Sequence, residues 1–254
     1  MNSLTNSRLL ATKKAMLFGL SLLFWIPVIF FSLLLIYNTL PYFKFDPKMP
    51  FIQERNALYV RWIWRVSFYI HIAAGSLCIA TALLQFSSWI LRKRKKIHIV
   101  AGRIYVMVVL LLGAPSGFYM TFFAKGGYWE KACFMMMAIA WFFFTYKGFT
   151  TAVREKNFVA HKYWMIRSYA MALTAVTFRI YYVAFYLYGM ENFSNYAISL
   201  WISVVGNALV AEAIIFFSAK DYLKSLRISE TGNIRLSPMA VSHETTDNQQ
   251  LTTN

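Results

Sequence analysis

Long apolar runs dominate this sequence and constrain its fold more than any other feature. A helix of about 20 apolar residues crosses the hydrocarbon core of a bilayer, and six runs of at least roughly that length are present. Backbone polar groups find no water in lipid, so each run is expected to form a helix. The sequence therefore predicts an all-α, six-span transmembrane bundle over residues 15–37, 66–90, 100–123, 131–150, 164–188 and 197–218.

Composition excludes the main alternatives to a membrane protein. Charged residues make up only 14% of the chain, whereas a soluble domain carries about 25%. The net charge of +16 would suit nucleic acid. However, the basic residues lie between apolar runs, and no nucleic-acid-binding motif accompanies them. The lipid bilayer is thus the expected partner, and no nucleic acid is expected.

Lys and Arg are distributed unequally between the two sides of this topology. On the side of both termini, 15 Lys and Arg residues lie in the segments 1–14, 91–99, 151–163 and 219–254. On the other side, 7 lie in the segments 38–65, 124–131 and 189–196. Cytoplasmic loops carry the excess of positive residues. Both termini are therefore predicted to be cytoplasmic. The expected parts are a cytoplasmic N-terminus (1–14), the transmembrane domain (15–226) and a disordered polar cytoplasmic tail (227–254).

Small and polar residues recur at helical spacing in the second and fifth runs. The second run carries His71, Gly75, Cys78, Ala82 and Gln85 on one face. The fifth carries a similar face from His161 to Tyr186, with Arg179 past its middle. A charge at that depth costs about 2.5–3.5 kcal/mol on insertion scales, so such residues usually face the protein interior. Spans 2 to 5 are expected to form a four-helix core.

Other intramembrane polar residues divide into two expected clusters. On the cytoplasmic side, Arg103 and Arg167 each follow a histidine, and Glu212, the only acidic residue in the six runs, is expected to pair with one of them. On the opposite half, His71 and Arg179 are expected to be neighbours. Asn207 accompanies Glu212 in the sixth run.

Two strings in this region are specific enough to resemble a known family. They are accompanied by shorter matches, and together they read His98-Ile-Val-Ala-Gly102-Arg103-Ile-Tyr105, His161-Lys-Tyr-Trp164-Met165-Ile-Arg167-Ser168-Tyr169, His71-Ile-Ala-Ala-Gly75, Gln85-Phe86 and Gly126-Gly127. They resemble a predicted-membrane-protein family called domain of unknown function 2306, over about residues 66–188. The resemblance implies a multi-pass membrane protein without an established activity, in a cell membrane or bacterial inner membrane.

The first functional interpretation is haem b-linked redox activity. Two imidazoles at equal depth on different helices can hold haem iron, and His98 and His161 both lie where a span begins on the cytoplasmic side. Arg103 and Arg167 could pair with the haem propionates. The architecture is similar to six-helix cytochromes b that use ascorbate, but those have four histidines, and here the outer half offers only His71. The electron donor is not indicated by the sequence.

A second interpretation is a transporter or binding protein for a small polar or anionic solute. His71, Gln85, Arg179, Asn207 and Glu212 would line its cavity. A third assigns these residues purely structural roles. One zinc ion bound by all three histidines is not expected, because His71 lies roughly 20–30 Å from the other two. Soluble nucleotide chemistry is not supported, since no phosphate-binding or hydrolase motif is present.

Overall fold

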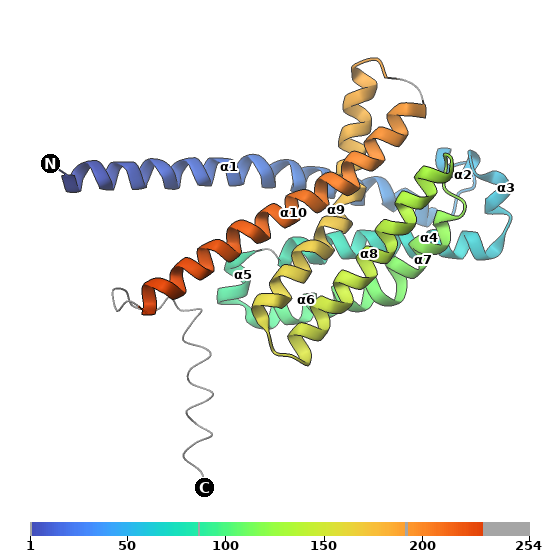
Figure 1. Cartoon of the computed structure of the whole chain (residues 1–254). Helices are drawn as coiled ribbons and strands as arrows, with labels where there is room; N and C mark the ends of the chain where they lie inside the picture. Colours follow the sequence, from blue (N-terminus) through green and yellow to red (C-terminus); the bar gives the residue numbers. More distant parts are fainter. Residues whose placement is uncertain (1, 86, 191–192, 231–254) are drawn as a thin grey trace, which may run out of the picture. The chain divides into compact units, whose positions relative to one another are not determined.

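Six long helices account for the apolar runs in the computed structural model, which describes residues 2–85, 87–190 and 193–230. Six of the described helical segments are long and apolar enough to cross a membrane. They lie in α1 (Asn2–Thr39), α4 (Trp62–Gln85), α6 (Lys95–Val108) with its continuation to Thr121, α8 (Tyr128–Val153), α9 (Phe158–Leu187) and α10 (Phe193–Glu230) (Figure 1). The predicted all-α, six-span class is confirmed, and the side on which the termini lie stays a prediction.

Some boundaries differ from the predicted runs. The first apolar run, predicted to end at residue 37, continues as helix to Thr39 and leads into the 3-10 turn η1 (Leu40–Lys44). The second helix ends at Gln85 instead of residue 90. Beyond it, the side chain of Ser87 accepts a hydrogen bond from the Ile90 amide and caps the short helix α5 (Ser88–Lys93). A polar cap of this kind starts a new helix.

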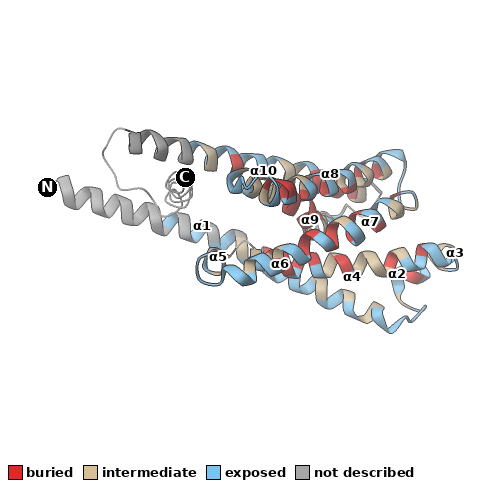
Figure 2. Ribbon diagram, turned by 90° about the horizontal axis from the view of Figure 1, so that it is seen from below, coloured by how far each residue is buried: buried red, intermediate tan, exposed pale blue. Residues whose placement is uncertain are grey.

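The helices that carry the polar faces pack against one another in pairs. α8 and α9 form the most extensive pair, while α4 packs against α6, its continuation and α9. Figure 2 shows buried residues on α4, α6, α8 and α9 opposite exposed ones on the same helices. These pairings are consistent with the expected core of spans 2 to 5. Cys78 and Cys133 are buried free thiols.

The third span changes its winding in the middle. A π-helical turn, η2 (Val109–Gly113), separates α6 from α7 (Ala114–Thr121). Pro115, at the start of α7, has no amide hydrogen for the carbonyl of Leu111 and would clash with it in a regular helix. The side chain of Ser116 donates to the carbonyls of Leu112 and Gly113, at 2.5 and 3.2 Å. In lipid, such side chains satisfy carbonyls that an irregular turn leaves available.

The loops at the opposite end of the bundle from the 92–96 cluster are partly helical. Residues 38–65 were predicted as a long external loop, and they include η1, α2 (Pro50–Gln53) and α3 (Asn56–Tyr59). Arg55 donates to the carbonyl of Phe123 at 2.7 Å, and Lys125 forms an exposed ion pair with Glu54. The hydrogen bond and charge of Lys125 lower the pKa of the Glu54 carboxyl. These contacts join the loop after span 1 to the loop after span 3.

The Gly126-Gly127 pair has a clear backbone role. Gly126 adopts φ +102°, in the region that favours glycine, and a Cβ there would lie 2.7 Å from Cγ of Glu130. This tight turn lets the Gly127 amide donate to Oε2 of Glu130 at 2.6 Å. Glu130 is therefore a second acidic residue inside a membrane-length helix, which the predicted boundary at residue 131 had excluded.

The chain divides into two units, which meet within α10. The first extends to Val210, and the second begins at Ala211. In the first unit, Leu200 and Val204 of α10 pack with the buried thiol of Cys133. α10 reaches Glu230, so it includes the first four residues of the predicted 227–254 tail, and the rest of that tail lies outside the described residues.

We expect Gly113→Val to destabilise the bundle. A Cβ at Gly113 would lie 3.2 Å from the ring of Trp141 and 3.6 Å from Cβ of Ala74, so this helix contact has no room for a larger side chain. Overpacking of this kind typically costs about 1–3 kcal/mol. The unfolding midpoint of the purified protein in detergent measures the effect.

Gly206→Val is the matched control, because nothing lies within 4 Å of a Cβ at Gly206. It introduces the same β-branched side chain into a helix without the collision. Equal midpoints for the two variants would show that Gly113 is not a close-packing position.

Candidate functional site

His98 and His161 occupy equivalent positions on two helices. Each is the fourth residue of its helix, because α6 begins at Lys95 and α9 at Phe158. These helices belong to spans 3 and 5, so they cross the membrane in the same direction. We call the end of the bundle where they begin, which carries residues 92–96, the basic end.

A hydrogen bond deeper in the bundle sets the register of these two helices. Tyr105 and Ser168 each lie seven residues after their histidine, which places them on the same helix face about 10.5 Å further along the axis. The phenol oxygen of Tyr105 is 2.8 Å from Oγ of Ser168, and both residues are buried. Because this contact is the same distance from both histidines, His98 and His161 lie at equal depth.

His161 is oriented by a backbone carbonyl of the neighbouring helix. Its Nδ1 lies 2.7 Å from the carbonyl oxygen of Gly148 on α8. A carbonyl only accepts, so Nδ1 carries the proton and Nε2 keeps its lone pair. Gly148 permits this close approach, since a Cβ there would lie 2.6 Å from Sδ of Met165. Metal-binding histidines are typically oriented by such a bond.

His98 has a different environment. Its backbone carbonyl accepts a 2.8 Å hydrogen bond from Nε2 of Gln85, which ties the start of α6 to the end of α4. Gly102 lies against the same amide, and a Cβ there would be 3.2 Å from Oε1 of Gln85. The side-chain Nδ1 of His98 is buried and has no hydrogen-bond partner among the described residues. Leaving a buried polar group unsatisfied costs about 1–3 kcal/mol.

The two arginines of the strings lie on the same helices as the histidines. Arg103 is exposed on α6. Arg167 is half-buried, and its guanidinium carbon lies 4.8 Å from the ring centroid of Trp164. This distance is within the range of a cation–π contact. The basic end is thus strongly cationic, with the exposed 92–96 cluster beside the start of α6.

A closed ring of hydrogen bonds surrounds the Tyr105–Ser168 contact. Nε1 of Trp141 donates to the Tyr105 phenol at 3.2 Å. Oγ1 of Thr145 lies 2.7 Å from Oγ of Ser168 and donates to the Trp141 carbonyl at 2.7 Å. One direction satisfies every group: Trp141 donates to Tyr105, Tyr105 to Ser168, Ser168 to Thr145, and Thr145 to Trp141. Fully satisfied buried networks of this kind make a core rigid.

His71 and Arg179 lie away from the basic end, and each bonds to a backbone carbonyl. Nδ1 of His71 donates to the Gly113 carbonyl of the π-helical turn at 3.2 Å. Gly117 makes room for the ring, because a Cβ there would be 2.9 Å from Cε1 of His71. Arg179 lies on α9, and its expected contact with His71 stays a prediction. Its side chain is exposed and donates to the Ala175 carbonyl at 2.6 Å.

The other predicted polar residues are Gln85, which bonds to the backbone of His98, and Asn207 and Glu212, which lie on α10. Nδ2 of Asn207 donates to the Ala170 carbonyl at 3.1 Å and to Oγ1 of Thr177 at 3.1 Å, which fastens α10 to α9. Gln85 lies at the basic end, away from His71. Glu212 belongs to the second unit, so its expected ion pair with Arg103 or Arg167 stays a prediction.

Sequence reasoning missed half of the hydrogen-bond ring. Tyr105 and Ser168 stood out through their strings, but Trp141 and Thr145 did not. The two lie four residues apart on one face of α8, and Trp141 is followed by three phenylalanines that indicate lipid contact instead. The sequence feature that could have indicated their place in the ring is a Trp and a Thr, both able to form hydrogen bonds, four residues apart in an apolar run.

The fold and this polar interior define a multi-pass helical membrane protein. Residues 68–215 match the family of predicted membrane proteins defined by DUF2306, and the chain belongs to this family. The matched region ends within α10, beyond the expected limit near residue 188. No curated protein and no solved structure matches the chain.

We expect Ser168→Ala to destabilise the protein by about 1–3 kcal/mol, because it leaves Tyr105 without an acceptor and Thr145 without a donor. Adding Tyr105→Phe should cost less than the sum of the single changes, since both variants break one ring. Unfolding free energies of the two single variants and the double variant in detergent measure this coupling.

Ser203→Ala is the control. Ser203 is equally buried, but its hydroxyl donates within its own helix, to the Ser199 carbonyl at 2.6 Å. Its loss should therefore change stability little. Strictly additive effects at Tyr105 and Ser168 would argue against the ring.

Proposed function

We propose that this chain is a haem b-linked membrane redox protein whose iron is held between the imidazoles of His98 and His161. The observation that carries the proposal is the Tyr105–Ser168 hydrogen bond. It fixes two parallel helices so that their histidines lie at one depth, which a haem held from both faces requires.

The two imidazoles differ in how their ring nitrogens are hydrogen-bonded. His161 is held with its Nδ1 proton on the Gly148 carbonyl, so Nε2 is available as a ligand atom. The buried Nδ1 of His98 has no hydrogen-bond partner among the described residues, and coordination of iron by this nitrogen would satisfy it. Both rings are ligands of the type that haem iron takes in membrane cytochromes.

The charges at the basic end suit the rest of the cofactor. Haem carries two propionates, and Arg103, Arg167 and the 92–96 cluster supply cations at the same end of α6 and α9. Guanidinium groups form strong, directional hydrogen bonds to carboxylates. Stacking on Trp164 restricts the Arg167 side chain, so less freedom is lost when it binds an anion.

When bound, the haem would supply one-electron chemistry. The chain would hold the iron from both faces and orient His161 through Gly148. The hydrogen-bond ring would close the deep side of the site, because Tyr105 and Ser168 are buried and fully partnered there. Because His98 and His161 would both hold the iron, electron transfer is the activity that this set of residues would favour.

A solute-binding or transport site has less support. Its proposed lining included Gln85 and Asn207, whose amides instead donate to His98 and Ala170 carbonyls. A cavity lined by all five residues would need these helix-to-helix bonds to break.

A dithionite-reduced minus oxidised spectrum tests the haem proposal. The protein should be expressed with haem supplied, purified in detergent, and show α and Soret bands. His98→Ala and His161→Ala should each abolish the bands, because each removes one ligand of the iron.

His71→Ala is the matched control and should retain both bands, since His71 lies on the other half of the bundle. Size-exclusion profiles and circular dichroism of all variants establish that they are folded. A folded wild-type protein without bands would falsify the proposal, and so would bands that survive loss of His98 and His161.

A further inference from the structure

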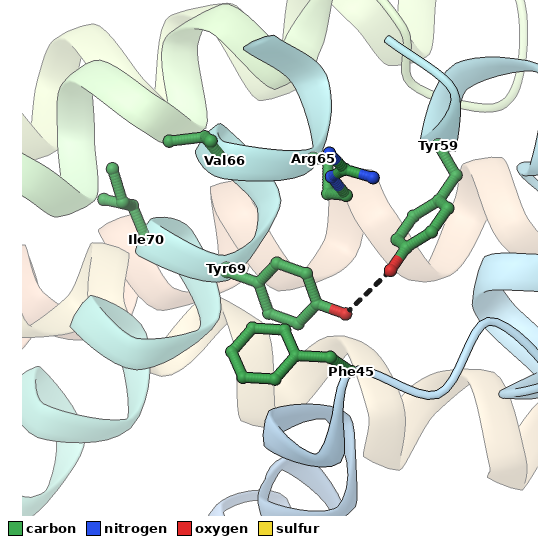
Figure 3. Close-up of a pocket in the computed structure, with 6 residues that line it drawn as sticks. All are labelled: Phe45, Tyr59, Arg65, Val66, Tyr69 and Ile70. Atoms are coloured by element: carbon green, nitrogen blue, oxygen red, sulfur yellow. Dashed lines mark hydrogen bonds between the residues drawn. The ribbon is translucent and has the colours of Figure 1, made fainter. Parts of the chain in front are cut away.

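A cavity of about 490 Å³ lies at the opposite end of α4 from the basic end. Figure 3 shows its lining, with side chains from α4, from α3 and from the residue after η1. The lining residues are Phe45, Tyr59, Arg65, Val66, Tyr69 and Ile70. The volume is within the range of roughly 300–1,000 Å³ that small-molecule sites occupy.

The sequence builds this cavity from one helix face and two aromatic flanks. Arg65 and Tyr69 lie four residues apart on α4, as do Val66 and Ile70, so all four share a face. Phe45 adopts φ 57°, and its ring centroid lies 4.7 Å from that of Tyr69. One part of the lining is thus apolar, and the other combines a guanidinium with phenols.

The polar part of the cavity presents hydrogen-bond donors. The hydroxyls of Tyr59 and Tyr69 lie 3.4 Å apart and point toward each other (Figure 3). The guanidinium carbon of Arg65 lies 5.5 Å from the ring centroid of Tyr59, and the side chain is exposed. Among the described residues, Arg65 has no carboxylate partner, and the nearby acidic residue Glu54 is paired with Lys125 instead.

We propose that this cavity binds the phosphate of an acidic phospholipid headgroup. Arg65 would form charge-assisted hydrogen bonds to the phosphate oxygens, and the Tyr59 and Tyr69 hydroxyls would donate to the same group. Arg65 is the fourth residue of α4, one turn inside a membrane-spanning helix. A cation and aromatic residues at this depth lie at the headgroup level.

The lining also selects among phosphate-bearing ligands. Phe45, Val66 and Ile70 offer an apolar wall for the glycerol and upper acyl chains, which free phosphate would leave unused. A zwitterionic lipid would bring a cationic group, and the lining contains no carboxylate to receive it. Arg65 already covers the Tyr59 ring, so that face is not free for a second cation.

Native mass spectrometry of the delipidated full-length protein, titrated with dioleoylphosphatidylglycerol, tests this site. Arg65→Gln should weaken binding about tenfold, the loss expected when a charged hydrogen bond worth about 1.4 kcal/mol is removed. Arg61→Gln should bind like wild type, because Arg61 is exposed on the same segment but does not line the cavity.

Two further arms keep the result decisive. Tyr59→Phe with Tyr69→Phe preserves both rings and should also weaken binding, which covers the case that Arg65→Gln fails to fold. Dioleoylphosphatidylcholine should bind more weakly, and millimolar inorganic phosphate should not compete. Equal binding by Arg65→Gln and Arg61→Gln, equal binding of the two lipids, or competition by phosphate would each overturn the proposal.

Discussion

The hydrogen bond between Tyr105 and Ser168 is the constraint on which the rest of the polar interior depends. It joins two parallel helices, α6 and α9, that pack chiefly against other partners, α4 and α8. Inside a membrane no water competes for these hydroxyls, and an unpaired one would be costly. The contact therefore fixes the relative height of the two helices. Residues two turns away on the same helix faces, including His98 and His161, are therefore also aligned with each other along the helix axes.

Glycines allow the histidines to reach backbone carbonyls in this bundle. His161 bonds to the carbonyl of Gly148, and His71 to that of Gly113. At both glycines a Cβ would press against a neighbouring side chain, so the helices approach more closely than larger residues would allow. Small residues at helix contacts are typical of membrane bundles. Here the close approach also fixes which ring nitrogen carries the proton.

The sequence predicted the fold class well because it depends on quantities that a single chain displays. Run length and low charge indicated six membrane-spanning helices, and polar spacing indicated that Cys78 and Ser168 face the interior. The π-helical turn before Pro115 was not predicted, because its position depends on which carbonyls Ser116 and His71 can satisfy. That information lies in the packing of α4 against the third span.

Side-chain roles were harder to predict than side-chain locations. Gln85 and Asn207 were correctly placed inside predicted spans, but both amides donate to carbonyls of a neighbouring helix. An amide in lipid binds the nearest available carbonyl, and sequence spacing does not show which helix supplies it. Arg179 illustrates the same limit, since its guanidinium binds the Ala175 carbonyl one turn earlier on its own helix.

The asymmetry of the bundle constrains any redox function that the basic end performs. Two histidines meet at that end, whereas His71 alone occupies the other half and already donates to the π-helical turn. A single haem near one surface would exchange electrons with partners on that surface or with carriers in the adjacent leaflet. Movement of electrons across the whole bilayer would need a second centre near His71, and Arg179, the other polar residue predicted there, is a cation and not an iron ligand. The proposed site therefore favours electron exchange on one side of the membrane over a transmembrane relay.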